Sequence, residues 1–197
     1  MSEQQPQRPF SNFQVHPSAS SFTISSNDYV SKHAELKAAN CLLSTGAAVF
    51  SGSTPERILL IQRAAGDSMP NRWEIPGGAC DDDDPSILHS VARELWEESG
   101  LAAVRVGPHF GRDDIFRSRS GKVICKLYFI VEIDKGDEDK LEVKLDLNEH
   151  QNFIWATEEE VKAKKVGDLE LTFTTPTLEK NVLESFQIRE ELSAGAN

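Results

Sequence analysis

The alternation of apolar and polar positions divides the chain into short strand-like segments separated by turn signals. The strongest β pattern is at residues 123–133. Residues 51–55, Ser-Gly-Ser-Thr-Pro, mark a turn, and Pro76-Gly77-Gly78 ends a short segment. We expect strands at residues 41–50, 57–62, 73–75, 104–106, 114–117, 123–133 and 153–155.

A helical period replaces this alternation before Gly100. Asp84 is a suitable N-cap, Pro85 a suitable first helical residue and Gly100 a typical C-terminal glycine. The apolar side of this helix is predicted to comprise Leu88, Val91, Ala92 and Leu95. Further helices are expected from about residue 28 to 36, at residues 158–165 and at residues 176–189.

This order of elements predicts an α/β (α+β) fold with a mixed β-sheet sandwiched between helices. Residues 1–21 are rich in Gln, Pro and Ser, so we expect a disordered or loosely attached arm. Phe10, Phe13 and Phe22 are unusual there, and packing on the domain or on a partner would explain them equally. Residues 22–197 are expected to form one domain without internal repeats.

Composition narrows the functional classes. The chain has 197 residues, a net charge of −11 and a pI near 4.9, which argues against a nucleic-acid binder that uses a basic surface. It has no apolar run long enough to span a membrane and no secretory signal pattern. Three widely spaced cysteines indicate a reducing compartment. We expect a cytoplasmic protein, with the nucleus as the alternative.

Three carboxylates gather on the helix that ends at Gly100. Glu94, Glu97 and Glu98 fall within an arc of roughly 100°, because residues three and four apart are neighbours on a helix. Like charges at this spacing repel each other. Beside a Gly-Gly turn, such a cluster favours a divalent metal ion, and Mg²⁺ prefers oxygen ligands and substrate phosphates.

Residues 78–101 resemble the signature box of the Nudix hydrolase family. That box reads Gly, five residues, Glu, seven residues, then Arg-Glu-apolar-any-Glu-Glu-any-Gly-apolar. The second half is matched throughout by Arg93, Glu94, Leu95, Glu97, Glu98, Gly100 and Leu101. The flanking residues 58–63 and 73–78 resemble the MutT-like branch, and the resemblance spans about residues 38–165.

The first half of the box departs from the family pattern. Fourteen residues separate Gly78 from Arg93, where the family has thirteen. Asp84 is nearest to the family's first glutamate, which pairs with the box arginine. Because Asp84 is out of register and expected to cap the helix, we expect Arg93 to pair elsewhere, with Glu97 as a candidate.

The resemblance implies the roles of the site residues. Glu94, Glu97, Glu98 and Arg93 would be catalytic. Glu94, Glu97 and Glu98 would bind Mg²⁺, with Mn²⁺ as an alternative, and Glu94 could instead orient the attacking water. The Gly78 carbonyl, or that of Gly77, would complete the metal shell.

Other residues remain candidates in this interpretation. Glu149 would add a further metal ligand or base, and an exposed loop residue is an equal alternative. Asp81 lies where the family frequently has a glutamate next to the metal, and this role and an ordinary turn residue are equal alternatives. Arg63 and Trp73 are candidates for substrate binding, although core packing is favoured for Trp73. His150 is a candidate for a substrate contact, although an ordinary loop histidine is favoured. The substrate is expected to be chosen by residues 107–121 and 135–149, including Arg112, Arg117 and Arg119.

The leading hypothesis is a Mg²⁺-dependent hydrolase that cleaves the diphosphate of a nucleoside diphosphate derivative. Candidate substrates are an oxidised nucleoside triphosphate, ADP-ribose and a dinucleoside polyphosphate. The partner would be this small molecule, with no nucleic acid or membrane, and the oligomeric state is open. The alternative is a nucleotide-binding module without catalysis. An isopentenyl diphosphate isomerase needs a catalytic cysteine, and Cys80 is misplaced for that role.

Overall fold

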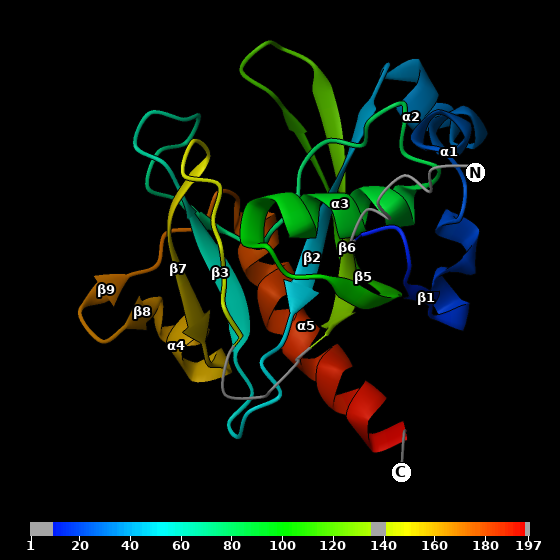
Figure 1. Cartoon of the computed structure of the whole chain (residues 1–197). Coiled ribbons are helices and arrows are strands. Elements are labelled where there is room, and N and C mark those ends of the chain that lie inside the picture. Colours follow the sequence, from blue (N-terminus) through cyan, green and yellow to red (C-terminus); the bar gives the residue numbers. More distant parts are fainter. Residues whose placement is uncertain (1–9, 135–140, 196–197) are drawn as a thin grey trace, which may run out of the picture.

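Two β-sheets form the framework of the protein, for which the computed structural model describes residues 10–134 and 141–195. The larger sheet has the order β1-β5-β6-β2, and the smaller has the order β4-β3-β7 (Figure 1). The larger sheet contains β1 (Gln14–Val15), β5 (Ala103–Arg117), β6 (Val123–Ile133) and β2 (Leu42–Val49). The smaller contains β4 (Trp73–Glu74), β3 (Ile58–Arg63) and β7 (His150–Ala156). A separate hairpin pairs β8 (Lys165–Val166) with β9 (Leu169–Glu170).

The larger sheet is mixed, as expected. Strands β5 and β6 are antiparallel, whereas β2 runs parallel to β6 and β1 runs parallel to β5. The central strands carry continuous apolar runs because both faces of the sheet are covered.

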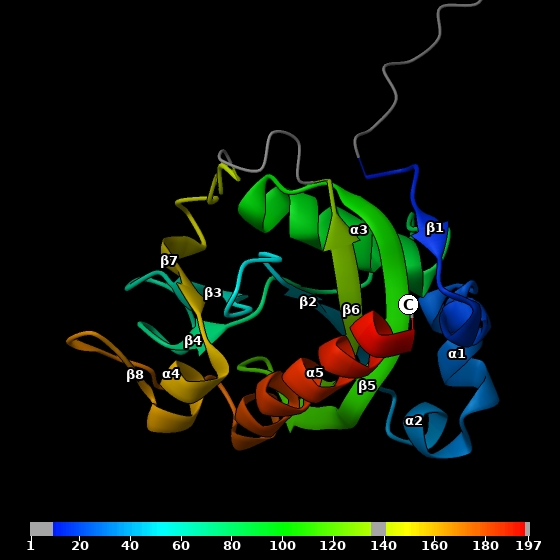
Figure 2. The same ribbon diagram turned by 90° about the horizontal axis from the view of Figure 1, so that it is seen from below.

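Helices α3 and α5 lie on opposite sides of the strands (Figure 2). Each covers its own hydrophobic cluster: Leu88, Val91 and Leu95 of α3 belong to one, and Leu178 and Val182 of α5 to the other. The apolar side predicted for the box helix is therefore confirmed, and so is the arrangement of sheet between helices. The helices are α1 (Ser26–Lys32), α2 (Ala34–Ala38), α3 (Ile87–Ser99), α4 (Glu158–Ala163) and α5 (Pro176–Gly195).

Strand β5 corrects the prediction of two short strands joined by a loop. Most of residues 107–121 belong to this single strand, which pairs with β6 along its length. Gly107, Pro108 and Gly111 coincide with shifts of register between the two strands, so they bend the ladder without ending it. The loop expected to choose the substrate is thus largely strand. Residues 135–140 of the other expected loop lie outside the described residues.

The N-terminal segment also differs from the expected loose arm. Residues 14 and 15 add a parallel strand to β5, and a 3₁₀-helix, Pro17–Phe22, follows. Ala19 and Phe22 are buried, and the Phe22 ring lies 5.0 Å from that of Phe129 between centroids. Apolar side chains hold this segment on the domain even though its composition is polar. The expected boundary at residue 22 remains a prediction.

In the described part of the chain, none of the helices has the length and apolar character needed to cross a bilayer.

Phe22→Ala tests how firmly the N-terminal segment is attached. We expect the free energy of unfolding to fall by about 3 kcal/mol, because a buried aromatic contact is lost and a cavity remains. Urea denaturation measures the change. Phe153→Ala is the matched control, since Phe153 is 37% exposed, and it should change stability by about 0.5 kcal/mol. Equal losses in the two variants would contradict the packing described here.

Candidate active site

The turn after β4 packs its backbone directly on β2 and α3. The backbone N–H of Thr45 donates to the Gly78 carbonyl, and that of Ala47 donates to the Pro76 carbonyl, both at 2.8 Å. Gly77 has φ +149°, and a Cβ there would collide with the Thr45 carbonyl. A Cβ on Gly78 would lie 2.5 Å from Glu94 Oε2. Gly77 therefore needs to be glycine, because a side chain there would collide with the β2 backbone, whereas a side chain at Gly78 would push the Glu94 carboxylate aside.

Two of the three helix carboxylates are buried behind this turn. Glu94 and Glu98 are each no more than 9% exposed. The Gly77 N–H donates to Glu98 Oε2 at 2.6 Å. The side chain of Glu97 is 51% exposed and faces outward. The three predicted carboxylates thus lie on one face of α3, where Glu94 and Glu98 are buried and Glu97 is exposed.

Arg93 joins these carboxylates to the loop before the helix. Its guanidinium donates to Asp84 Oδ2 and Glu94 Oε1 at 2.8 Å, to Glu97 Oε2 at 2.9 Å and to the Ala79 carbonyl at 2.8 Å. Pairing with Glu97 agrees with the prediction. Pairing with Asp84 corrects the expectation that the extra residue in the box would separate the two.

The correction follows from how the helix begins. Its N-cap is Ser86 and its first residue is Ile87, not Asp84 and Pro85 as predicted. Asp84 is therefore free to accept hydrogen bonds from Arg93 and from the Ser90 hydroxyl. Burial works to raise the pKa of Asp84, but the hydrogen bonds from Arg93 and Ser90 outweigh it and lower the pKa.

A second charged group, not predicted as part of the site, lies beside Glu98. Glu74 is buried on β4, with Arg63 Nη1 at 2.5 Å, His150 Nε2 at 3.2 Å and Lys126 Nζ at 3.9 Å from its carboxylate. Burial works to raise the pKa of Glu74, yet its basic neighbours together lower it to about 2. Glu74 therefore stays ionised at neutral pH.

The pKa values of Glu94 and Glu98 are shifted in the opposite direction to that of Glu74. Burial, with the nearby charge of Glu97, raises the pKa of Glu94 to about 7, although Arg93 acts against this rise. Burial and the charge of Glu74 raise the pKa of Glu98 well above its ordinary value. The positive charge near these two carboxylates, that of Arg93 at Glu94 and of Lys126, does not offset the effect of burial on their pKa. They supply hard oxygen ligands, and the Gly78 carbonyl beside them has a second lone pair, so the donor set fits Mg²⁺ or Mn²⁺.

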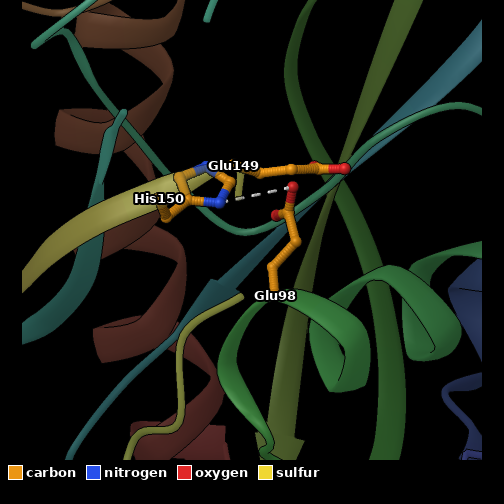
Figure 3. A group of neighbouring side chains, drawn as sticks. All are labelled: Glu98, Glu149 and His150. Atoms are coloured by element: carbon orange, nitrogen blue, oxygen red, sulfur yellow. Dashed lines mark ion pairs between the residues drawn. The ribbon is translucent and has the colours of Figure 1, made fainter. Parts of the chain in front are cut away.

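Glu149 and His150 meet Glu98 from the start of β7 (Figure 3). One ligand atom from each of the three residues lies within 4.8 Å of the other two. Glu149 is exposed, and its role as a ligand stays a prediction. His150 is 1% exposed, so the interpretation as an ordinary loop histidine is wrong.

A cleft of about 580 Å³ is lined by Glu74, Gly77 and Gly78. Arg63 lines it, but its guanidinium donates to Glu74, Asp67 and the Ser68 carbonyl. Trp73 is fully buried, which corrects its candidacy for substrate binding in favour of core packing. The cleft is also lined by Lys126, Arg117 and Arg119. Arg112 is instead held through its backbone by Asn181.

Glu74, Lys126 and His150 were not predicted as site residues, and only the first two had a signal in the sequence, which was weak. Glu74 and Lys126 are charged residues within otherwise apolar strand segments, and such residues are rarely buried unless paired. His150 had no such signal, because its contact with Glu74 joins residues 76 positions apart.

Comparison with solved structures defines the class of fold. A MutT protein from Methanosarcina mazei Go1 matches with a TM-score of 0.56 and 24% identity, over 77% of this chain and 96% of its own. A C. elegans Ap4A hydrolase in a binary complex matches with a TM-score of 0.57 and 18% identity, over 76% of this chain and 98% of its own. The NUDIX domain of Shewanella oneidensis NrtR, complexed with ADP ribose, matches with a TM-score of 0.55 and 18% identity, over 86% of this chain and 99% of its own. Likeness at these identities establishes the fold.

The family follows from the sequence match. The family model for the NUDIX domain matches residues 42–174, so the chain belongs to the NUDIX family, as its box predicts. A curated relative, the m7GpppN-mRNA hydrolase NUDT17 from Bos taurus, is 42% identical over 57 residues, which is 28% of this chain. The match covers 18% of that relative's length. These matches support the expected hydrolase class.

Asp84→Asn tests whether the hydrogen bonds from Arg93 to Asp84 stabilise the fold. We expect the free energy of unfolding at neutral pH to fall by about 2 kcal/mol, because Arg93 keeps its two glutamates but loses a buried partner. The contribution of Asp84 should be present above pH 3.8 and disappear as the pH falls through the lowered pKa of the folded state. Urea denaturation over this range measures both effects. Asp83→Asn, at an exposed neighbouring position, is the control, and a loss equal to that of Asp84→Asn would contradict the assignment.

The raised pKa of Glu94 and Glu98 predicts an unusual pH dependence in metal-free protein. Between pH 4.5 and about 7 the folded state binds more protons than the unfolded state at Glu94, so this contribution to stability falls as the pH rises. In the presence of a chelator, the variant Glu94→Gln/Glu98→Gln should lose less stability over this window than the parent. Denaturation at several pH values measures the two slopes, and Glu159→Gln, at an exposed position, is the control. Identical slopes in parent and double variant would refute the prediction.

Proposed function

We propose that the protein is a metal-dependent pyrophosphohydrolase that uses Mg²⁺ or Mn²⁺ to cleave the diphosphate of a nucleoside diphosphate derivative. The observation that carries the proposal is the pair of buried carboxylates, Glu94 and Glu98, whose pKa values burial raises even though Arg93 donates to Glu94. A purely structural role would favour apolar residues at such positions, because burying uncompensated charge is costly.

The proposal assigns a role to each group. Glu94, Glu97, Glu98, the Gly78 carbonyl and Glu149 hold the metal, which when bound neutralises phosphate charge and activates water. Arg93 fixes Glu94 and Glu97 relative to each other through bonds of 2.8 and 2.9 Å.

The cleft supplies positive charge for the substrate. Lys126, Arg117 and Arg119 line it and are placed to attract the phosphates, because positive side chains outnumber the two carboxylates, Glu74 and Asp114, that also line the cleft. The Glu74 carboxylate forms ion pairs with Arg63 and Lys126, which line the same cleft. Water would attack a phosphorus atom of the diphosphate, and positioning with charge neutralisation would carry most of the catalysis.

The candidate substrates remain an oxidised nucleoside triphosphate, ADP-ribose and a dinucleoside polyphosphate. Two of these classes agree with similar structures, one of an Ap4A hydrolase and one of a NUDIX domain complexed with ADP ribose. The curated relative acts on capped mRNA ends by its name, which adds a capped dinucleotide to the compounds worth testing. The alternative remains a binding module that does not cleave its nucleotide.

Glu98→Gln tests the catalytic assignment. We expect kcat to fall at least about 100-fold, because loss of a metal-binding charge removes several kcal/mol of transition-state stabilisation. The assay measures products by chromatography over the candidate diphosphates with Mg²⁺ and with Mn²⁺. A nucleoside monophosphate, which lacks the anhydride, serves as the negative substrate.

Glu159→Gln is the matched control because Glu159 is exposed on α4, and it should retain full activity. Full activity in Glu98→Gln would overturn the assignment of this carboxylate. Tight binding of a nucleotide without cleavage by the parent protein would favour the binding module.

A further inference from the structure

His150 has a buried ring nitrogen that lacks a hydrogen-bond partner. Its side chain is 1% exposed, and Nδ1 has no partner among the described residues. Nδ1 lies 3.8 Å from Glu98 Oε1, which is too long for a hydrogen bond. Because buried polar atoms in folded proteins are almost always hydrogen-bonded, this atom requires an explanation.

The other ring nitrogen fixes the tautomer of His150. Nε2 lies 3.2 Å from Glu74 Oε1, and Arg63 donates to the same oxygen at 2.5 Å. A carboxylate held by an arginine accepts hydrogen bonds and donates none, so Nε2 carries the proton. In the neutral ring Nδ1 then presents a lone pair toward Glu98, whose Oε1 lies 3.8 Å away. A carboxylate behind the distal N–H of histidine is the arrangement that supports metal-bound imidazoles.

Glu149 completes a set of three possible ligands. Figure 3 shows the carboxylates of Glu98 and Glu149 on the same side of the His150 ring. One ligand atom from each residue lies within 4.8 Å of the other two. Nitrogen and oxygen ligands about 2.1 Å from one ion lie roughly 3.0–4.2 Å apart, so small movements would close the set around a cation.

The backbone holds this set in place before any ion binds. The Ala64 N–H donates to the Glu149 carbonyl, and the His150 N–H donates to the Asp146 carbonyl, both at 2.8 Å. Glu98 is held from the other side by the Gly77 N–H. The three ligands therefore come from two elements, α3 and the start of β7, whose positions the fold has already fixed.

We propose that Glu98, Glu149 and His150 Nδ1 form a binding site for a divalent transition-metal ion, such as Mn²⁺ or Zn²⁺. One imidazole and two carboxylates suit these ions better than Mg²⁺, which takes oxygen ligands. The inference deepens the proposed function and rests on it, because Glu98 and Glu149 belong to both ligand sets. It adds a nitrogen ligand and a preference among metals.

Pulsed electron paramagnetic resonance tests the nitrogen ligand directly. The full chain, freed of metal, receives one equivalent of Mn²⁺. We expect a ¹⁴N modulation that changes to that of ¹⁵N when the protein is made with ¹⁵N-histidine. Mn²⁺ bound without any histidine coupling, or no Mn²⁺ bound at all, would overturn the proposal. This test needs no variant, so it does not depend on how a substitution affects folding.

Variants then identify the histidine. His150→Gln should abolish the modulation and weaken Mn²⁺ binding, measured by titration calorimetry, at least about tenfold, with a smaller effect on Mg²⁺. His16→Gln is the matched control and should leave both readouts unchanged, since His16 lies in the N-terminal segment. Modulation that persists in His150→Gln would refute the assignment.

A second variant avoids the buried position. Glu149 is exposed, so Glu149→Gln should fold normally and still weaken Mn²⁺ binding, whereas the exposed Glu159→Gln should not. Unchanged Mn²⁺ affinity in Glu149→Gln would remove Glu149 from the site.

Hydrolysis with Mg²⁺, assayed on the same samples, separates this inference from the proposed function. Mg²⁺-supported cleavage without histidine coupling would overturn the transition-metal site and leave the hydrolase. Histidine coupling without cleavage of any tested diphosphate would support the site and overturn the hydrolase.

Discussion

The close contact between the Gly77-Gly78 turn and the carboxylates of α3 governs the geometry of the whole site. A Cβ at Gly78 would lie 2.5 Å from Glu94 Oε2, and Glu98 accepts a hydrogen bond from Gly77. The same turn is tied to β2 through backbone hydrogen bonds. The turn is therefore fixed on β2 by backbone atoms, and the carboxylates of Glu94 and Glu98 pack against it from α3.

Positive side chains lie on both sides of this contact. Arg93 compensates the outer side of the cluster, where Asp84 and Glu97 share its guanidinium. Arg63, Lys126 and His150 surround Glu74 on the inner side. Glu94 and Glu98, between the two groups, receive less positive charge than their burial requires, and the pKa of each is raised. The shortage of positive charge at this point is what makes a bound cation favourable there.

The errors of the sequence analysis were confined to places where local and long-range preferences compete. Asp84-Pro85 is a good local start for a helix, yet Ser86 caps it, because Asp84 gains more by accepting hydrogen bonds from Arg93. Gly107 and Pro108 suggested a loop, but pairing with β6 continues past them through shifts of register. The polar composition before residue 22 suggested a loose arm, although Ala19 and Phe22 find a buried site on the domain.

The sequence by itself determined the family, the mixed sheet between helices and the face of α3 that carries Glu94, Glu97 and Glu98. These properties depend on helical and strand periods and on a motif within about 25 residues, so local spacing was enough to predict them. Only the tertiary structure decided the partner of Arg93, the burial of Trp73 and the meeting of Glu74, Glu98 and His150. Those contacts join distant parts of the chain, and periodicity along the sequence has no information on which elements become neighbours or how deeply a side chain is buried.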